Sequence, residues 1–156
     1  MYERILVSLD GSKLAECVLP YVEELVDRLA SPKPVITLLQ VISSTYHYVV
    51  QVGESVQVPY TEEELKPIKK SAAEYLTRIG NILKKKGATI NVMVTAGDAA
   101  GEILRIAKEM DASMIAMTTH GRTGIARWVL GSVADKVIRT TNVPLLVVRC
   151  LEVPKE

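Results

Sequence analysis

The segment between Thr118 and Ser132 carries residue types that bind phosphate in many proteins. An apolar run ends at Thr118, Gly121 lies in the polar stretch that follows, and Gly131 with Ser132 precedes an amphipathic segment at residues 133–139. Glycines let backbone N–H groups approach an anion closely, and a serine at a helix start can contact the same anion. The same residues would also suit a long strand-to-helix connection in which the serine caps the helix. The spacing alone favours neither interpretation, so a phosphate cradle and a structural loop both stay open.

Three further side chains could act on a phosphate compound bound at this segment. Asp10 follows the first apolar run and could bind a ribose hydroxyl or help to hold a metal ion, or it could simply cap a helix within an Asp-Gly-Ser turn. Arg122 could neutralise phosphate charge or lie in solvent. His120 has no nucleophilic partner in the sequence and is typical of a loop residue that forms hydrogen bonds. We therefore expect binding residues here and no catalytic residue.

Strand and helix patterns alternate along the chain. Short runs rich in Val, Ile and Leu predict strands, and apolar residues three and four positions apart predict helices. This alternation favours an α/β fold with a parallel, doubly wound sheet and helices on both faces. The predicted strands cover residues 4–9, 35–42, 89–95, 113–117 and 145–149, and the predicted helices cover residues 13–30, 61–86, 99–110 and 133–140. Pro20 is expected to kink the first helix.

The predicted topology brings the candidate residues together. Ligands of such sheets bind at the carboxyl ends of the strands, where the strand order reverses. The loops after the first strand (Asp10), the second strand (Val41) and the fourth strand (residues 118–132) would meet at this edge. Their convergence is the strongest physical argument for a binding site.

Residues 43–60 have no helical period and are long for a plain connection. Segments of this length are often lids or partly disordered, and we expect a loop here. Tyr46 and Tyr48 could cover an adenine, or they could belong to a mobile surface loop.

Composition limits the classes of function. The chain of 156 residues is expected to be one domain, and its 19 basic and 18 acidic residues create no strong field for nucleic acid or an anionic membrane. No apolar run approaches the length of a membrane span. Cys17 and Cys150 stand apart in the sequence without metal-ligand spacing, which indicates unpaired cysteines in a reducing cytoplasm.

The last predicted strand bears on assembly. Residues 144–148 are strongly apolar and would lie at the edge of the sheet, where an uncovered strand invites pairing with another chain. Pairing with a second copy would give a two-fold dimer, whereas residues 150–156 could instead cover the strand.

The pattern as a whole resembles the universal stress protein family over nearly the full chain. Residues 5–12 (Ile-Leu-Val-Ser-Leu-Asp-Gly-Ser) resemble the first strand and turn of that family. Residues 119–124 (Thr-His-Gly-Arg-Thr-Gly), 131–139 and 143–148 (Val-Pro-Leu-Leu-Val-Val) resemble its C-terminal signature. The ATP-binding branch carries Gly-x-x-Gly, nine residues, and Gly-Ser/Thr. Gly121 and Gly131–Ser132 match the later part of this motif, and Thr118 stands in place of its first glycine.

The resemblance implies a five-stranded sheet of order 3-2-1-4-5, a homodimer through residues 143–149, and ATP held between the first and fourth strand ends. Asp10 would meet the ribose or phosphates, and Val41 would bind adenine through its backbone. The triphosphate would be held by Gly121, Arg122, Gly131, Ser132 and Val133, and the nucleotide-binding set is completed by Ser8, Thr118 and His120.

Three functions remain open. The chain could be a regulatory protein of the stress response that binds ATP with Mg²⁺, a slow ATP hydrolase, or a dimeric interaction module of the same fold that binds no nucleotide. Thr118 is the evidence for the third function. We favour ATP binding without fast turnover, because phosphoryl transfer needs a group that positions water and the sequence offers arginines but no convincing base.

Overall fold

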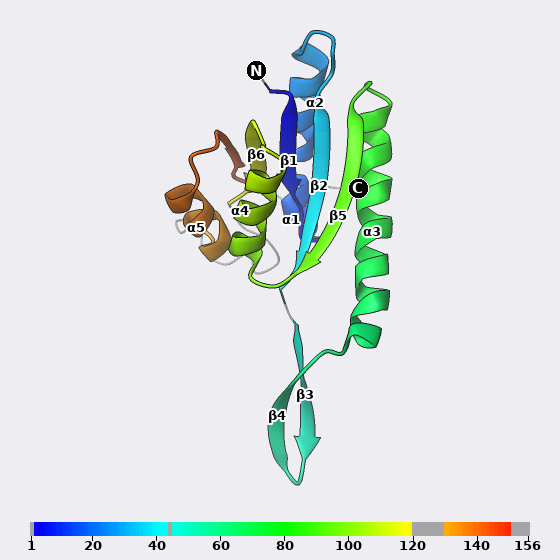
Figure 1. Ribbon diagram of the computed structural model, residues 1–156, viewed down its shortest axis with the longest axis vertical. Coiled ribbons are helices and arrows are strands. Elements are labelled where there is room, and N and C mark those ends of the chain that lie inside the picture. Colours follow the sequence, from blue (N-terminus) through cyan, green and yellow to red (C-terminus); the bar gives the residue numbers. More distant parts are fainter. Residues whose placement is uncertain (1, 44, 120–129, 151–156) are drawn as a thin grey trace.

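The computed structural model describes residues 2–43, 45–119 and 130–150. Its centre is a five-stranded sheet in which every neighbouring pair is parallel, in the order β5-β2-β1-β6-β7 (Figure 1). The strands are β1 (Arg4–Ser8), β2 (Val35–Ile42), β5 (Thr89–Ala96), β6 (Met114–Thr118) and β7 (Leu145–Val148). Counted along the chain within this sheet, the order is 3-2-1-4-5. The predicted fold class and strand order are therefore confirmed.

Helices cover both faces of the sheet. The helices α1 (Lys13–Glu16), α2 (Leu19–Arg28) and α3 (Glu62–Lys84) pack on one face, and α4 (Ala99–Glu109) and α5 (Ser132–Thr140) pack on the other. The predicted helix at residues 13–30 is in fact two helices, and Pro20 lies in the first turn of α2. Proline is tolerated there because its missing N–H would have no partner inside the helix. No helix in the described ranges is long and apolar enough to cross a membrane.

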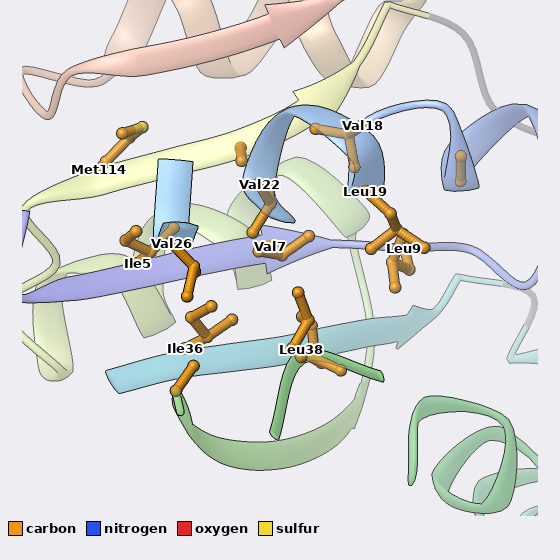
Figure 2. Close-up of a cluster of buried hydrophobic side chains, with 14 of the residues drawn as sticks. Ile5, Val7, Leu9, Val18, Leu19, Val22, Val26, Ile36, Leu38 and Met114 are labelled. Carbon is orange, nitrogen blue, oxygen red and sulfur yellow. The ribbon is translucent and has the colours of Figure 1, made fainter. Parts of the chain in front are cut away.

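The core on the first face is aliphatic. Ile5 and Val7 of β1 and Ile36 of β2 meet Val22 and Val26 of α2, and all five are fully buried (Figure 2). Burying such a side chain contributes about 1.5–3 kcal/mol relative to leaving it exposed. Branched side chains on adjacent parallel strands therefore fix α2 against β1 and β2, and with it the turn that precedes α1.

The start of α3 has a capping box. The N–H of Thr61 donates to a carboxylate oxygen of Glu64 at 2.8 Å, and the N–H of Glu64 donates to the hydroxyl oxygen of Thr61 at 3.2 Å. Two N–H groups that the helix itself leaves unpaired are thereby satisfied. The helix start predicted from the sequence is confirmed.

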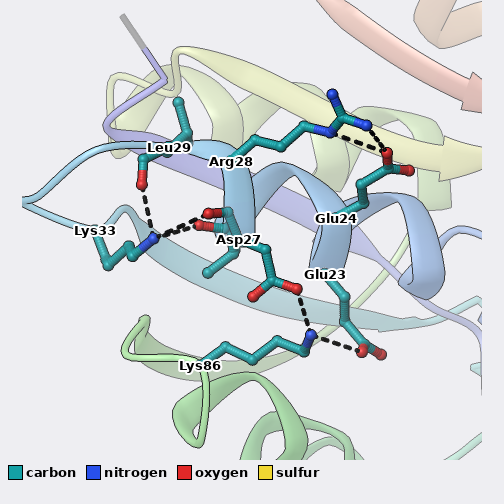
Figure 3. A network of polar contacts seen from close by, with 8 residues as sticks. Glu23, Glu24, Asp27, Arg28, Leu29, Lys33 and Lys86 are labelled. Atoms are coloured by element: carbon teal, nitrogen blue, oxygen red, sulfur yellow. Dashed lines mark hydrogen bonds and ion pairs between the residues drawn. The ribbon is translucent and has the colours of Figure 1, made fainter.

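Polar contacts connect the C-terminal ends of α2 and α3 (Figure 3). The Nζ of Lys86 contacts carboxylate oxygens of Asp27 at 2.6 Å and Glu23 at 3.7 Å. The Nζ of Lys33 donates to the carbonyl oxygens of Val26 at 2.8 Å and Leu29 at 2.7 Å. These lysines place positive charge at the C-terminal end of α2, where it is favourable.

Residues 43–60 differ from the expected loop. They contain an antiparallel hairpin of β3 (Tyr46–Gln51) and β4 (Glu54–Pro59), which extends away from the sheet at the end where β2 leaves it (Figure 1). Val52 and Gly53 form its turn, both with positive φ, which suits a two-residue hairpin connection. Tyr48 is 72% exposed. The expectation of a loop was wrong because the alternating valines around a Val-Gly turn carry a strand pattern.

The cysteines also differ from expectation. Cys17, at the junction of α1 and α2, forms a disulfide bond with Cys150, just after β7, and their Cα atoms are 5.8 Å apart. The prediction of unpaired cysteines was wrong because a sequence separation of 133 conceals their proximity in the fold.

Candidate nucleotide-binding site

The candidate site lies at the carboxyl ends of β2, β1 and β6. The chain proceeds from β1 to β2 and β5 on one side, and β6 and β7 lie on the other side of β1. The strand order therefore reverses between β1 and β6, which is where open α/β sheets bind ligands. Because β1 lies between β2 and β6, the turn at Asp10 occupies the middle of the site.

The turn after β1 is rigidly arranged. A carboxylate oxygen of Asp10 accepts hydrogen bonds from the N–H of Ser12 at 2.9 Å and from its hydroxyl at 2.6 Å. The Ser12 hydroxyl oxygen accepts from the N–H of Ala15 at 3.1 Å and caps α1. Gly11 has φ of 81°, a conformation that glycine adopts without strain. The structure thus supports the turn interpretation of Asp10, while its half-buried carboxylate still lies at the site.

The start of α5 differs from the starts of α1, α3 and α4. Those three helices each have a side-chain cap from Ser12, Thr61 or Asp98, whereas the N-cap of α5 is Gly131, which has none. The first N–H groups of a helix carry partial positive charge and attract anions when no side chain occupies them. Ser132 and Val133 are the first two residues of α5 and contribute these groups.

Ser8 and Thr118 end the two central strands on opposite faces. Ser8 is two residues after Leu6 and therefore shares its face of the strand. Leu6 packs in the cluster beneath α4 and α5, so Ser8 lies on the α5 side. Thr118 shares a face of β6 with Met114 and Ala116, which pack against α2, and it is 7% exposed. Thr118 also pairs with Val148 of β7. The residue that replaces the motif glycine is therefore an integral part of the sheet.

Val41 lies beyond the end of the β1–β2 pairing. The described pairs of these two strands end at Ser8 and Leu39, and the carbonyl oxygen of Leu39 accepts from the N–H of Leu9 at 2.9 Å. Backbone groups two residues apart in a strand point to the same neighbour. The N–H and C=O of Val41 consequently point toward the turn at Asp10, where β1 has already ended.

A cavity of about 620 Å³ opens beside Val41. This volume is in the range of small-molecule sites. Its walls come from the end of β2, the turn after β1 and one face of α3. The lining residues are Gly11, Gln40, Val41, Ile42, Ser43, Tyr60, Pro67, Ile68, Ser71, Ala72 and Tyr75. Sequence analysis identified Val41 but missed Gln40 and Tyr75. A polar amide in a predicted strand whose other residues, apart from Thr37, are apolar was the available signal for Gln40.

The cavity has a negative neighbourhood. The hydroxyl of Tyr75 donates to a carboxylate oxygen of Glu16 at 3.2 Å. Burial raises the pKa of Tyr75, and the carboxylates of Glu16 and Asp10 raise it further. Negative charge here disfavours a phosphate, whereas the start of α5 on the other side of β1 favours one. The arrangement can thus bind an elongated ligand with an anionic end at α5 and an uncharged end at Val41.

The remaining predicted site residues, His120, Gly121 and Arg122, lie outside the described residues. The described parts contain no cluster of three or more His, Cys, Asp or Glu that could hold a metal ion by itself.

The chain is similar to known proteins over nearly its whole length. The model of the universal stress protein family matches residues 1–149. Universal stress protein MJ0577 of Methanocaldococcus jannaschii is 30% identical over 158 aligned residues, which cover 96% of this chain and 96% of that protein. Universal stress protein YxiE of Bacillus subtilis is 27% identical, with 96% of this chain and all of that protein covered.

Solved structures show the same architecture. The structure of MJ0577 has a TM-score of 0.75 with 26% identity and covers 97% of this chain and 99% of its own. A universal stress protein from Archaeoglobus fulgidus in complex with dAMP has a TM-score of 0.61 with 23% identity, and the match covers 94% of this chain and 97% of that one. The match of the family model across both halves of the sheet is decisive: the chain belongs to the universal stress protein family.

Proposed function

We propose that this protein binds ATP with Mg²⁺ at the β1–β6 switch point and acts as a regulatory protein of the stress response without fast turnover. One observation carries the proposal: the Asp10 turn lies between a helix start that lacks a side-chain cap and a cavity that contains Val41. A nucleoside triphosphate has the matching shape, with an anionic end and a planar uncharged end. Family members solved in complex with cAMP and dAMP support an adenine nucleotide as the ligand.

We assign the residues by their place along this ligand. Val41 binds the base through its backbone, and Asp10 meets the ribose or the phosphates. The phosphates bind at Gly131, Ser132 and Val133, where the N–H groups of α5 begin. We also keep Ser8, Thr118, His120, Gly121 and Arg122 in the proposed site.

The residues present fit Mg²⁺ bound together with a nucleotide. Mg²⁺ is usually held by one or two carboxylates and by substrate phosphates, and it keeps several waters. Asp10 offers one half-buried carboxylate at the switch point. Bound there, the ion would neutralise part of the triphosphate charge.

Slow turnover follows from the surroundings of Asp10. Hydrolysis needs a group that orients the attacking water. The Asp10 carboxylate already accepts two hydrogen bonds from Ser12, which hold it in the turn. We therefore assign it to binding.

The protein should be tested first for its own ligand. Nucleotide extracted from the purified protein is identified by mass, and ATP and AMP are then titrated by calorimetry. Binding of ATP that weakens on Gly131→Val is expected. No binding at millimolar ATP would rule out both nucleotide functions and leave the interaction module. Steady phosphate release that is lost on Ser132→Ala would instead indicate an ATPase.

We further propose a homodimer through residues 143–149. β7 is an outer strand of the sheet, and Leu145 and Leu146 line a groove of about 360 Å³ whose other lining residues include Tyr2, Tyr21 and Leu25 together with the charged pair Glu24 and Arg28. An edge strand of this kind favours pairing with a second copy. Sedimentation should give a dimer, and a monomer at micromolar concentration would contradict the assignment.

We also propose that residues 1–156 form one nucleotide-binding domain that resides in the cytoplasm. The disulfide bond removes the argument from unpaired cysteines, so the location needs a direct test by cell fractionation. Recovery in a membrane or secreted fraction would contradict it.

A further inference from the structure

Gln40 is a buried amide with an unused acceptor. Its side chain is 5% exposed and shares a face of β2 with Leu38 and Ile42, which are both buried and apolar. The oxygen Oε1 is buried and has no hydrogen-bond partner. Gln40 also lines the cavity beside Val41. An acceptor in an apolar setting without a donor is unfavourable, and native structures rarely leave one without a reason.

Tyr75, a half-buried residue that also lines this cavity, does have a partner for its polar group. The hydroxyl of Tyr75 is bonded to Glu16, so it is already engaged as a donor. Oε1 of Gln40 thus remains an acceptor in the cavity wall that a ligand donor could satisfy. Gln40 is also the neighbour of Val41 in the chain. A base whose N–H is bound by the Val41 carbonyl oxygen would therefore have a second acceptor, Oε1 of Gln40, close by.

We propose that Gln40 determines base specificity, its Oε1 accepting a hydrogen bond from the exocyclic amine of a 6-aminopurine. This inference rests on the proposed function, in which the base binds at Val41. The amine of adenine has two N–H groups, and the Val41 carbonyl and Gln40 can each accept one. Hypoxanthine and guanine carry an oxygen at the same position, and that oxygen would face Oε1 with no hydrogen between them as long as the Gln40 amide keeps the orientation of this structure, in which Oε1 rather than the Nε2 donor faces the base. Sites that accept a hydrogen bond from a substrate N–H strongly reject analogues without that N–H, because the protein acceptor is then left unpaired.

The test compares ATP with inosine triphosphate, in which an oxygen replaces the amine and the phosphates are unchanged. Calorimetry gives Kd for both ligands with the wild type and with Gln40→Met, which keeps a similar volume and removes the acceptor. The wild type should bind ATP at least about tenfold more tightly than inosine triphosphate. Gln40→Met should reduce this ratio of the two affinities by about tenfold. Gln57→Met makes the same substitution on the exposed β4 strand and should leave the ratio unchanged.

Two controls protect the test against a folding defect. Gln40→Glu keeps acceptor oxygens and should retain the preference for ATP. The wild type alone should also bind N6,N6-dimethyl-ATP, which has no amine hydrogen, about tenfold or more weakly than ATP.

The outcomes separate the two proposals. If the ratio of the affinities for ATP and inosine triphosphate is the same in the wild type and in Gln40→Met, and both still bind ATP, the role of Gln40 is overturned and ATP binding stays intact. Preference of the wild type for inosine triphosphate would also overturn it. Failure of the wild type to bind any of these triphosphates would overturn the proposed function and this inference together.

Discussion

The backbone N–H of Gly131 donates a hydrogen bond to the carbonyl oxygen of Thr119 at 2.8 Å. Thr119 is the first residue after β6, and Gly131 is the N-cap of α5. This bond holds the start of α5 directly at the end of β6. The helix N–H groups are consequently positioned by the sheet, and a phosphate bound there would be placed as firmly as the strand.

Gly131→Asp should separate helix stability from ligand binding. Gly131 has φ of −61° and ψ of 149°, which aspartate can adopt, and its carboxylate would cap α5. The free energy of unfolding should rise by about 0.3 kcal/mol, because Asp exceeds Gly as a cap by only a few tenths. Affinity for ATP should fall at least about tenfold, since a carboxylate would occupy the place proposed for phosphate. Urea titration and calorimetry measure the two effects.

Asn142→Asp is the matched control for this change. It adds the same charge at an exposed position just beyond the other end of α5. ATP affinity should stay within about twofold of the wild type, because charge effects of this kind fall off within a helical turn. Equal losses in the two variants would argue against phosphate binding at the start of α5.

The disulfide bond between Cys17 and Cys150 should contribute strongly to stability. It closes most of the chain into one loop, and cross-links of long loops remove more freedom from the unfolded state. Cys17→Ser should lower the free energy of unfolding by about 2–5 kcal/mol. Reduction of the wild type with dithiothreitol should lower it by a similar amount. Titration of the unfolded, unreduced protein should find no free thiol, and two free thiols would refute the bond.

The capping box of α3 should make stability depend on acid pH. Hydrogen bonds from the N–H and hydroxyl of Thr61 lower the pKa of Glu64 below its usual value of 4.5. A carboxylate with a lowered pKa in the folded state stabilises the protein fully above its unfolded pKa, and this contribution is lost as pH falls through the folded value. The difference in Tm between the wild type and Glu64→Ala should therefore shrink as pH falls from 6 to about 3. A difference that grows on acidification would contradict the assigned role of Glu64.

The sequence predicted the sheet well because buried parallel strands are continuous apolar runs. Residues 35–42 illustrate this: the predicted strand and β2 coincide. The helix starts predicted at residues 13, 61 and 99 also agree with α1, α3 and α4 to within one residue, because the turn residues that precede a helix are a local signal. For the site, Asp10, Val41, Gly131 and Ser132 do lie at the expected strand and helix ends, while their binding roles stay predictions.

What the sequence could not predict depends on long-range contacts. The bond between Cys17 and Cys150 depends on how α1 crosses the sheet toward β7. The unused acceptor of Gln40 depends on α3 covering that part of β2, since an amide in a strand could equally face solvent. The hairpin was missed for a different reason: the absence of a helical period was read as the absence of structure.

Lys33 should stabilise the fold through the end of α2. Its ammonium group donates to the carbonyl oxygens of Val26 and Leu29, which the helix end leaves without helical partners (Figure 3). Lys33→Met keeps the aliphatic stem and removes the charge, and the free energy of unfolding in urea should fall by about 1–2 kcal/mol. Lys66→Met removes an exposed lysine that pairs with Glu63 on the surface of α3, and it should cost no more than about 0.5 kcal/mol. Equal effects would show that the two carbonyl contacts stabilise the protein no more than a surface ion pair.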